Sequence, residues 1–505
     1  MAHDGRKEAQ LALTFVLAVS LAGAACTIPF ETTKAGYLEP DTLAAEEASA
    51  PWSPPPEAID ADTAETRALA APDPALVPTE TYDLPALVDV ALQTNPETRR
   101  AWEAARMRAA AFGRTLGEFL PDLEFRVDGV YAKYLFEAPN EPVSIKQYAV
   151  TPLVGLEWIL FDFGRRAEAS ESARRRLLAA NLNFNRALQE VIFEVQVAYF
   201  ALDAARGMLR AAERNLASAR AVYEAAEDRL THGLATKPDV LLTKQARAKA
   251  SYELESARVL VSDAEASLAL AVGVPANQSI RILPLHEQRI PPELGGSVDA
   301  LIDVALAERP DLAARVEELR AQEAMAREAK ADLYPTVYAS GNYGLDAWWY
   351  RFNGPPTVQN EQPVWTAGLG LRWSIFEGFA RLNTIREAEA EAARVRAEVE
   401  QAELETIAAV WRAYHDERSA QKKYEYAEVL LDASQEAYDS NLESYQRGLA
   451  TIVDLLTAER DLAEARYILV QSRADLLTQA ARVAYVAGTV AKPAPGAPDH
   501  PATPR

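Results

Sequence analysis

The segment RGLATIVDLLTAERDLAEARY (447–467) repeats a segment that stands 215 residues earlier, HGLATKPDVLLTKQARAKASY (232–252). Both contain Gly-Leu-Ala-Thr followed by an Asp-led stretch rich in Ala and Leu. A glycine after a helix provides the left-handed backbone that ends it, and a threonine caps the helix that follows. The chain is therefore expected to contain the same helix–turn–helix reversal twice.

The two reversals belong to a longer internal repeat. Similar residues recur at an interval that changes only from 214 (Pro121 to Pro335) to 215 (Gly233 to Gly448). Further matched pairs are LVDVALQTNP (87–96) with LIDVALAERP (301–310), Leu156-Trp158-Phe161 with Leu371-Trp373-Phe376, Ala198-Tyr199 with Ala413-Tyr414, and Gly273 with Gly488. A duplication over about 190 residues predicts two units with the same elements in the same order.

Each copy is expected to begin with helices and to continue with a pair of strands. Residues 86–118 are rich in Ala, Arg and Glu, and Pro96 is placed where a short helix ends and a longer one begins. Alternation of apolar and polar residues predicts strands at about 121–134, 148–160, 335–345 and 364–376. Loops are expected between the strands of each pair, around Pro139 to Pro142 and over DAWWYRFNGPPTVQNEQ (346–362).

The alternation in these strands is typical of a sheet between lipid and water. Leu123, Phe125, Val127 and Tyr131 share one face of the first strand, and Glu124, Arg126 and Asp128 share the other. Aromatic residues near the strand ends suit the girdles of a membrane barrel, and the expected anchors are Trp158, Phe161, Trp365, Trp373 and Phe376. For any one strand, a half-buried hairpin of a soluble protein is the alternative.

Each strand pair is followed by an unusually long helix. Residues 166–231 and 381–446 contain no proline, and about 65 helical residues extend roughly 100 Å. Returning helices are expected at about 238–271 and 453–487, after the Gly-Leu-Ala-Thr turns. Such antiparallel hairpins are not stable alone, so they are expected to pack side by side in an array of copies.

The ends of the chain differ from this repeat. Residues 1–26 have the pattern of a signal peptide, with Arg6 and Lys7 before an apolar run. Cys26 is the only cysteine and is expected to accept a lipid, the alternative being ordinary cleavage of the signal. Residues 27–80 are expected to form a Pro-rich acidic tether, and 489–505 a disordered tail.

Composition excludes several classes of function. The net charge of -22 and the absence of a basic stripe argue against nucleic-acid binding. After the signal, no stretch approaches the roughly 18–20 apolar residues of a membrane-crossing helix. The five histidines (His3, His232, His286, His415 and His500) lack metal-ligand spacing, so no catalysis, metal or cofactor is expected.

Four strands cannot close a barrel, and unpaired strand edges are not tolerated in hydrocarbon. The chain is therefore expected to oligomerise. Two copies give eight strands with an interior filled by side chains, whereas three give twelve and leave a lumen. Three copies are favoured if the assembly is a channel.

The repeat, the Trp158-x-x-Phe161 and Trp373-x-x-Phe376 strand motifs and the two G-L-A-T turns resemble the TolC outer-membrane efflux protein family over about residues 82–489. The resemblance implies a mixed α and β fold with efflux repeats at 81–290 and 291–488. It also implies a homotrimer in the bacterial outer membrane, with one shared twelve-stranded barrel and a twelve-helix periplasmic tunnel. The tether and Cys26 look like the lipoprotein branch that is paired with RND-type efflux systems.

The resemblance also implies partners and candidate positions. Its members dock onto a periplasmic adaptor protein and an inner-membrane pump of RND or ABC type. The expected docking tips are Gly233, Leu234, Ala235, Thr236, Gly448, Leu449, Ala450 and Thr451, and the expected tunnel-entrance residues are Asp454, Asp239 and Tyr445. The turns and acids also have a purely structural explanation, because Gly, Thr and Asp are favoured at helix ends.

The expected function is a passive exit duct for small toxic compounds or drugs. An exit duct of a type I protein secretion system is the alternative within the family. A periplasmic coiled-coil scaffold or adhesin that conducts nothing is the alternative outside it.

Overall fold

The computed structural model describes residues 81–137, 142–278, 280–284, 296–353 and 356–490, all within the unit Ala75–Arg505. The expected signal peptide, Cys26, the tether and nearly all of the tail lie outside the described residues. The elements, in chain order, are β1 (Thr81–Tyr82), α5 (Leu84–Thr94), α6 (Pro96–Gly117), β2 (Asp122–Phe136), β3 (Val143–Phe161), α7 (Arg165–Thr231), α8 (Lys237–Val272), β4 (Arg281–Ile282), α9 (Val298–Glu308), α10 (Pro310–Ala331), β5 (Thr336–Phe352), β6 (Thr357–Arg372), α11 (Ala380–Gln446) and α12 (Ile452–Val486).

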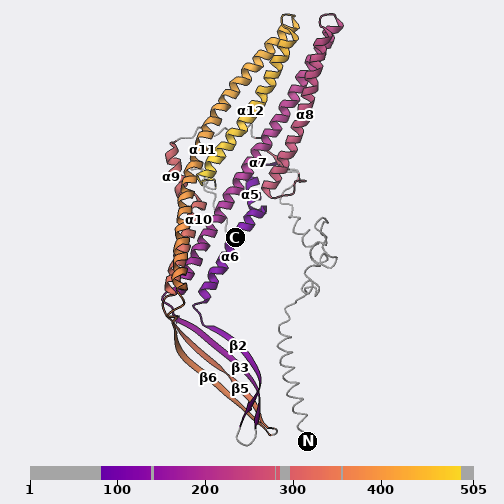
Figure 1. The fold of residues 1–505 in the computed structure, drawn as a ribbon. Helices are drawn as coiled ribbons and strands as arrows, with labels where there is room; N and C mark the ends of the chain where they lie inside the picture. Colours follow the sequence, from indigo (N-terminus) through magenta and orange to yellow (C-terminus); the bar gives the residue numbers. More distant parts are fainter. Residues whose placement is uncertain (1–80, 138–141, 279, 285–295, 354–355, 491–505) are drawn as a thin grey trace, which may run out of the picture. The chain divides into compact units, whose positions relative to one another are not determined.

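Two short helices, two strands and two long helices follow one another in each half of the chain (Figure 1). The helices α7 and α11 have 67 residues each, so each rises about 100 Å. The predicted bounds of 166–231 and 381–446 are confirmed to within one residue. The returning helices α8 and α12 bring the chain back along them, and both hairpins turn at the end away from the sheet (Figure 1).

The break between the short helices has a local cause. Asn95 leaves the helical conformation after α5, and its side chain accepts a hydrogen bond from the N–H of Glu97 at 2.8 Å, which caps α6. Pro96 occupies the first position of α6, where its missing N–H costs nothing. Pro310 begins α10 in the same way, so the predicted break at the proline is confirmed.

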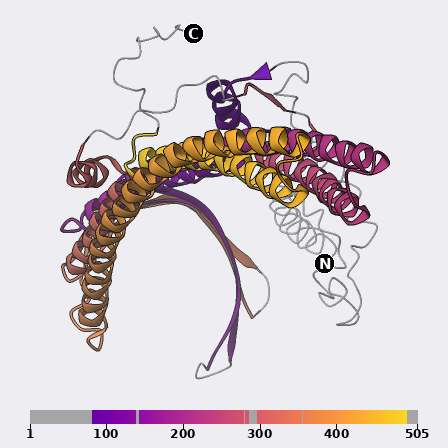
Figure 2. The ribbon, with the colours of Figure 1, turned by 90° about the horizontal axis from the view of Figure 1, so that it is seen from above.

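The four long strands form one antiparallel sheet in the order β2-β3-β5-β6. The two halves of the chain join at the β3–β5 pair, and β2 and β6 are the edges. The sheet is curved (Figure 2). The two-residue strands β1 and β4 make a separate parallel pair beside α5 and α7.

The prediction of a loop over 346–362 is wrong. Strand β5 continues to Phe352 and β6 begins at Thr357. The residues of DAWWYRF have high strand propensity, and their backbone pairs with β3 as far as the Ile145–Phe352 pair. The strand expected over 364–376 ends instead at Arg372, so Trp373 and Phe376 lie in the connection to α11.

Alanine is the commonest buried residue of the four long helices. One core cluster joins α7 to α8 through small side chains, with Ala212 and Ala219 facing Ala250 and Ala257. The contacts between α7 and α12 hold the two hairpins side by side. In the described part of the chain, no helix is both long and apolar enough to cross a membrane.

Candidate functional site at the hairpin tips

The Gly-Leu-Ala-Thr turns end the long helices with the same hydrogen bonds. Gly233 and Gly448 are left-handed, with φ of +73° and +77°. The N–H of Leu234 donates to the carbonyl of Arg229 at 2.7 Å, and the N–H of Leu449 to that of Ser444 at 2.8 Å. This six-residue closure satisfies carbonyls that the helix end leaves free, so the turn explains the glycine at both tips.

The acid that follows each turn caps the returning helix. The backbone N–H and the hydroxyl of Thr451 donate to the Asp454 carboxylate at 3.0 and 2.6 Å. At the other tip, the N–H and hydroxyl of Thr236 donate to Asp239, both at 2.8 Å. These bonds lower the pKa of both carboxyl groups, so both are ionised at neutral pH.

The two tips of one chain are tied together by Arg229. Its Nη1 donates to the carbonyls of Tyr445 and Gln446 at 3.1 and 3.3 Å, and its guanidinium lies 4.8 Å from the centre of the Tyr445 ring. Tyr445 is buried in this contact, and burial raises the pKa of its hydroxyl. The repeat does not indicate this role for Arg229, because the matching residue of the second copy is Ser444.

Two of the expected tunnel-entrance residues, Tyr445 and Asp239, share no hydrogen bond among those of the described residues. Asp239 is nevertheless close enough that its negative charge adds to the raised pKa of Tyr445. The carboxylate of Asp239 is instead bound by Thr236. The hydrogen bond that crosses between the tips is the one from Arg229 to the backbone carbonyl of Tyr445.

Each tip exposes one large apolar side chain. Leu234 is 67% and Leu449 is 80% exposed, and glycine, alanine and threonine surround both. The turn hydrogen bonds use only the backbone of these leucines. The fold therefore leaves two apolar side chains free for contact with another molecule.

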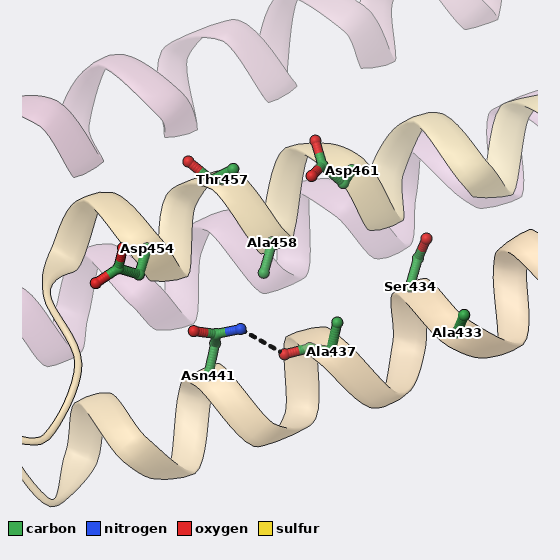
Figure 3. A pocket seen from close by; sticks show the side chains of 8 residues that line it. All are labelled: Ala433, Ser434, Ala437, Asn441, Asp454, Thr457, Ala458 and Asp461. Carbon is green, nitrogen blue, oxygen red and sulfur yellow. Dashed lines mark hydrogen bonds between the residues drawn. The ribbon is translucent and has the colours of Figure 1, made fainter.

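A groove of about 420 Å³ lies beside the second tip, between α11 and α12 (Figure 3). Asp454 and Asp461 line one side from α12, and Asn441 and Ser434 line the other from α11. The groove is lined by Asp454 and by a second carboxylate, Asp461, which the sequence analysis did not name as a candidate. Among the described residues, no group of three or more metal-ligating side chains is present.

The expected aromatic anchors lie at the other end of the helices. Trp158 donates its ring N–H to the carbonyl of Phe119 at 2.9 Å, and Trp373 donates to Leu333 at 3.0 Å. Both tryptophans thus tie the end of the sheet to the connection before it. Phe161 lies 4.7 Å from the ring of Phe163, Phe376 lies 5.5 Å from that of Phe379, and Trp365 stands exposed in β6 beside Tyr343.

A partly buried acid lies below the second tip. Glu459 of α12 is close to Tyr438 of α11 and to Arg466, which donates to Asn215 of α7 at 2.8 Å. Among the described residues, Glu459 Oε2 is buried without a hydrogen-bond partner. Burial raises the pKa of Glu459 to about 7, although the positive charge of Arg466 opposes the shift.

Glu459 is expected to make stability depend on pH. Its folded pKa of about 7 lies above the ordinary 4.5, so its contribution is fully present below pH 4.5 and is lost as the pH rises through 7. Glu459→Gln should therefore stabilise the protein at pH 8 by roughly 1–3 kcal/mol and flatten the pH dependence. Thermal midpoints at pH 5.5 and 8 measure this.

Glu464→Gln on the exposed side of the same helix is the control and should leave the pH dependence unchanged. An equal effect of both substitutions would show that the net charge, not the buried site, is responsible.

Comparison with known proteins gives a consistent set of relatives. A family model described as outer membrane efflux protein matches residues 87–274 and 301–489. The chain is 30% identical to Protein CyaE of Bordetella pertussis over 408 residues, 80% of this chain and 84% of that protein. It is 24% identical to the alkaline protease secretion protein AprF of Pseudomonas aeruginosa, over 67% of this chain and 69% of that protein. The solved structure of the Campylobacter jejuni CmeC outer membrane channel shares the fold, with a TM-score of 0.69 at 17% identity over 80% of this chain and 85% of that one.

Proposed function

The chain belongs to the outer membrane efflux protein family, and on that premise we propose that three copies form an exit duct through the bacterial outer membrane. The duct receives its cargo from a periplasmic adaptor and an inner-membrane pump, which supplies the energy. The observation that carries the proposal is the four-stranded sheet, which has one apolar face and two open edges.

The open edges support assembly. In the described chain, β2 and β6 each pair with one neighbour only, so each presents a row of unpaired N–H and C=O groups. Such groups are costly in hydrocarbon, and joining β6 of one copy to β2 of the next removes them. Three copies give twelve strands, enough for a lumen.

The strand register supports the orientation of the sheet. Leu123, Val154, Tyr343 and Leu369 belong to the set of alternate positions that forms one apolar face, called here the outward face. Towards the loops, this face carries an aromatic row of Tyr131, Tyr148 and Trp349, and then a charged row of Lys133, Lys146 and Arg351. An apolar band with an aromatic border and charges beyond it is what a membrane barrel needs on its lipid side.

The tips support docking. Six tips in a trimer would present six exposed leucines in one ring, with the Asp454 carboxylates beside them. An apolar contact of this kind suits end-on binding of an adaptor helix tip, and the acids would attract cations to the entrance. Cys26 is proposed to add a lipid anchor.

Conductance tests the duct. Purified protein in a planar bilayer is expected to give ion currents with a preference for cations, and to run as a trimer in detergent. A protein that gives no current and is recovered as a soluble monomer would instead be the non-conducting scaffold.

A photo-reactive residue at Leu449 is expected to capture the adaptor in cells, because this side chain is 80% exposed at the second tip. The same residue at Tyr426, 71% exposed on α11 away from the tip, is the control and should not capture it. Identification of the captured adaptor by mass spectrometry also separates two uses of the duct. An adaptor of a drug pump indicates efflux, whereas one of a protein exporter indicates secretion, the role in the name of AprF.

A further inference from the structure

The face of the sheet opposite the outward face is called here the inner face. Its residues change from polar to largely apolar near the loops. The positions opposite the outward face are polar over most of the sheet, as a wet lumen requires. At the loop end most of these positions are apolar and five are aromatic, with Gln147 and Asn360 as the polar exceptions. We call these six residues the mouth cluster: Tyr134, Phe136, Ile145, Trp348, Tyr350 and Phe352.

The register and the ring contacts place these residues together. Tyr134 pairs with Ile145, and Ile145 pairs with Phe352, so one row crosses three strands. Within β5, the Trp348 and Tyr350 rings lie 4.5 Å apart, and Tyr350 and Phe352 lie 6.3 Å apart. The cluster is therefore one continuous surface and not a set of scattered rings.

Lipid does not explain this surface. The outward face at the same level carries the charged row of Lys133, Lys146 and Arg351, which marks the end of the apolar band. The mouth cluster begins level with the outward aromatic row and continues past it, on the side that faces away from lipid. Tyr134, Phe136 and Phe352 are each about half exposed there.

The inner face between the mouth cluster and the helices is acidic. The carboxylates on its alternate positions outnumber the guanidinium groups; they are Asp122, Glu124, Asp128, Glu157 and Asp346, against Arg126 and Arg372. Arg126 pairs with Asp128 at 2.9 Å, and Arg372 reaches Glu157 at 3.8 Å. Each copy therefore adds net negative charge to the passage that leads to the mouth.

We propose that the mouth cluster binds cargo at the exit, and that the preferred cargo is an organic cation with an aromatic group. This inference rests on the proposed duct and names the class of compound that the duct handles. The acidic inner face attracts the positive charge. The rings then hold the aromatic group by stacking and the charge by cation–π attraction.

The lumen width favours cargo over closure by neighbouring copies. Around twelve strands the inward side chains line an open passage, whereas around eight they would fill it. The aromatic rings of three copies would therefore form a ring around the passage.

Channel block tests the proposal. The unblocked conductance of the full-length protein in a planar bilayer is measured first, and then benzyltriethylammonium is added on the loop side. Tetraethylammonium, which has the charge without the ring, and benzenesulfonate, which has the ring with the opposite charge, are the comparison ions. Benzyltriethylammonium is expected to block at a concentration at least about tenfold below that of either one.

The register supplies a matched pair of variants. Trp348→Leu with Tyr350→Leu removes two rings from the inner face and should raise the blocking concentration about tenfold. Trp349→Leu makes the same change at the adjacent residue on the outward face and should leave the block unchanged. Tyr350→Leu alone should raise the blocking concentration about threefold. This single variant replaces the double variant in the test if the double variant does not assemble.

Other outcomes would overturn the proposal. Equal block of the wild type and both inner-face variants would show that the cluster does not bind the cation. A larger unblocked conductance in those variants would show that neighbouring copies had closed the mouth with these rings. A wild type without any conductance would contradict the duct itself, and the inference would fall with it.

Discussion

Arg166→Ala is expected to lower the free energy of unfolding by about 3–5 kcal/mol. Arg166 lies where β3 passes into α7, and its side chain is only 5% exposed. Its Nε donates to Asp162 at 2.7 Å, its Nη1 donates to the carbonyl of Glu118 at 2.9 Å, and its guanidinium lies 4.9 Å from the centre of the Phe119 ring. Removing it leaves the Asp162 carboxylate, 8% exposed, without its counterion.

The second copy provides a matched control for this substitution. Arg381 occupies the same place at the start of α11 and donates to Glu377 at 2.8 Å, but the Glu377 side chain is 44% exposed. Water can solvate that carboxylate when the arginine is removed. Arg381→Ala should therefore change the thermal midpoint of the detergent-solubilised protein little, whereas Arg166→Ala should lower it strongly. Equal losses would mean that burial of the pair does not matter.

Gly344→Ala is expected to destabilise the sheet by about 3 kcal/mol, the upper end of the usual cost of overpacking. A Cβ at Gly344 in β5 would stand 2.2 Å from the carbonyl oxygen of Pro152 and 2.9 Å from Cα of Leu153 in β3. These are backbone atoms, so no side-chain rotation relieves the clash. The β3–β5 pair must separate locally, and this pair joins the two halves of the chain.

Gly368→Ala in β6 is the control, because a Cβ there meets nothing within 4 Å. Both substitutions remove a glycine from the same sheet, so they share the change in backbone freedom. The thermal midpoint and the fraction of trimer in detergent should fall for Gly344→Ala and hold for Gly368→Ala. A similar fall for both would indicate that chain flexibility, not the contact with β3, requires glycine.

The sequence predicted the helices better than the strands. A helix end is a local event, since Gly448, Thr451 and Asp454 make the turn and the cap among themselves. The ends of α7 and α11 were therefore predicted to within one residue. The same locality explains why both tip turns were found from a repeated short string.

The strand ends depend on partners that are distant in the sequence. Residues 346–352 have a local sequence, DAWWYRF, that stands next to Gly354-Pro355-Pro356, and nothing local shows that they pair with residues 145–150 of β3. The outward row of Tyr131, Tyr148 and Trp349 and the mouth cluster both follow from this pairing, so neither was predicted. Arg229 was missed for the same reason, because its partners lie 216 and 217 residues away.

The Arg229 contact also bears on how the tips would move in the proposed trimer. Arg229 of the first tip binds the backbone of the second tip, so the ends of the two hairpins of one chain are tied to each other. We therefore expect the two hairpins of each chain to move together. In the proposed trimer, the entrance would then consist of three moving units and not of six separate hairpins, and an adaptor that binds one hairpin per chain would move both.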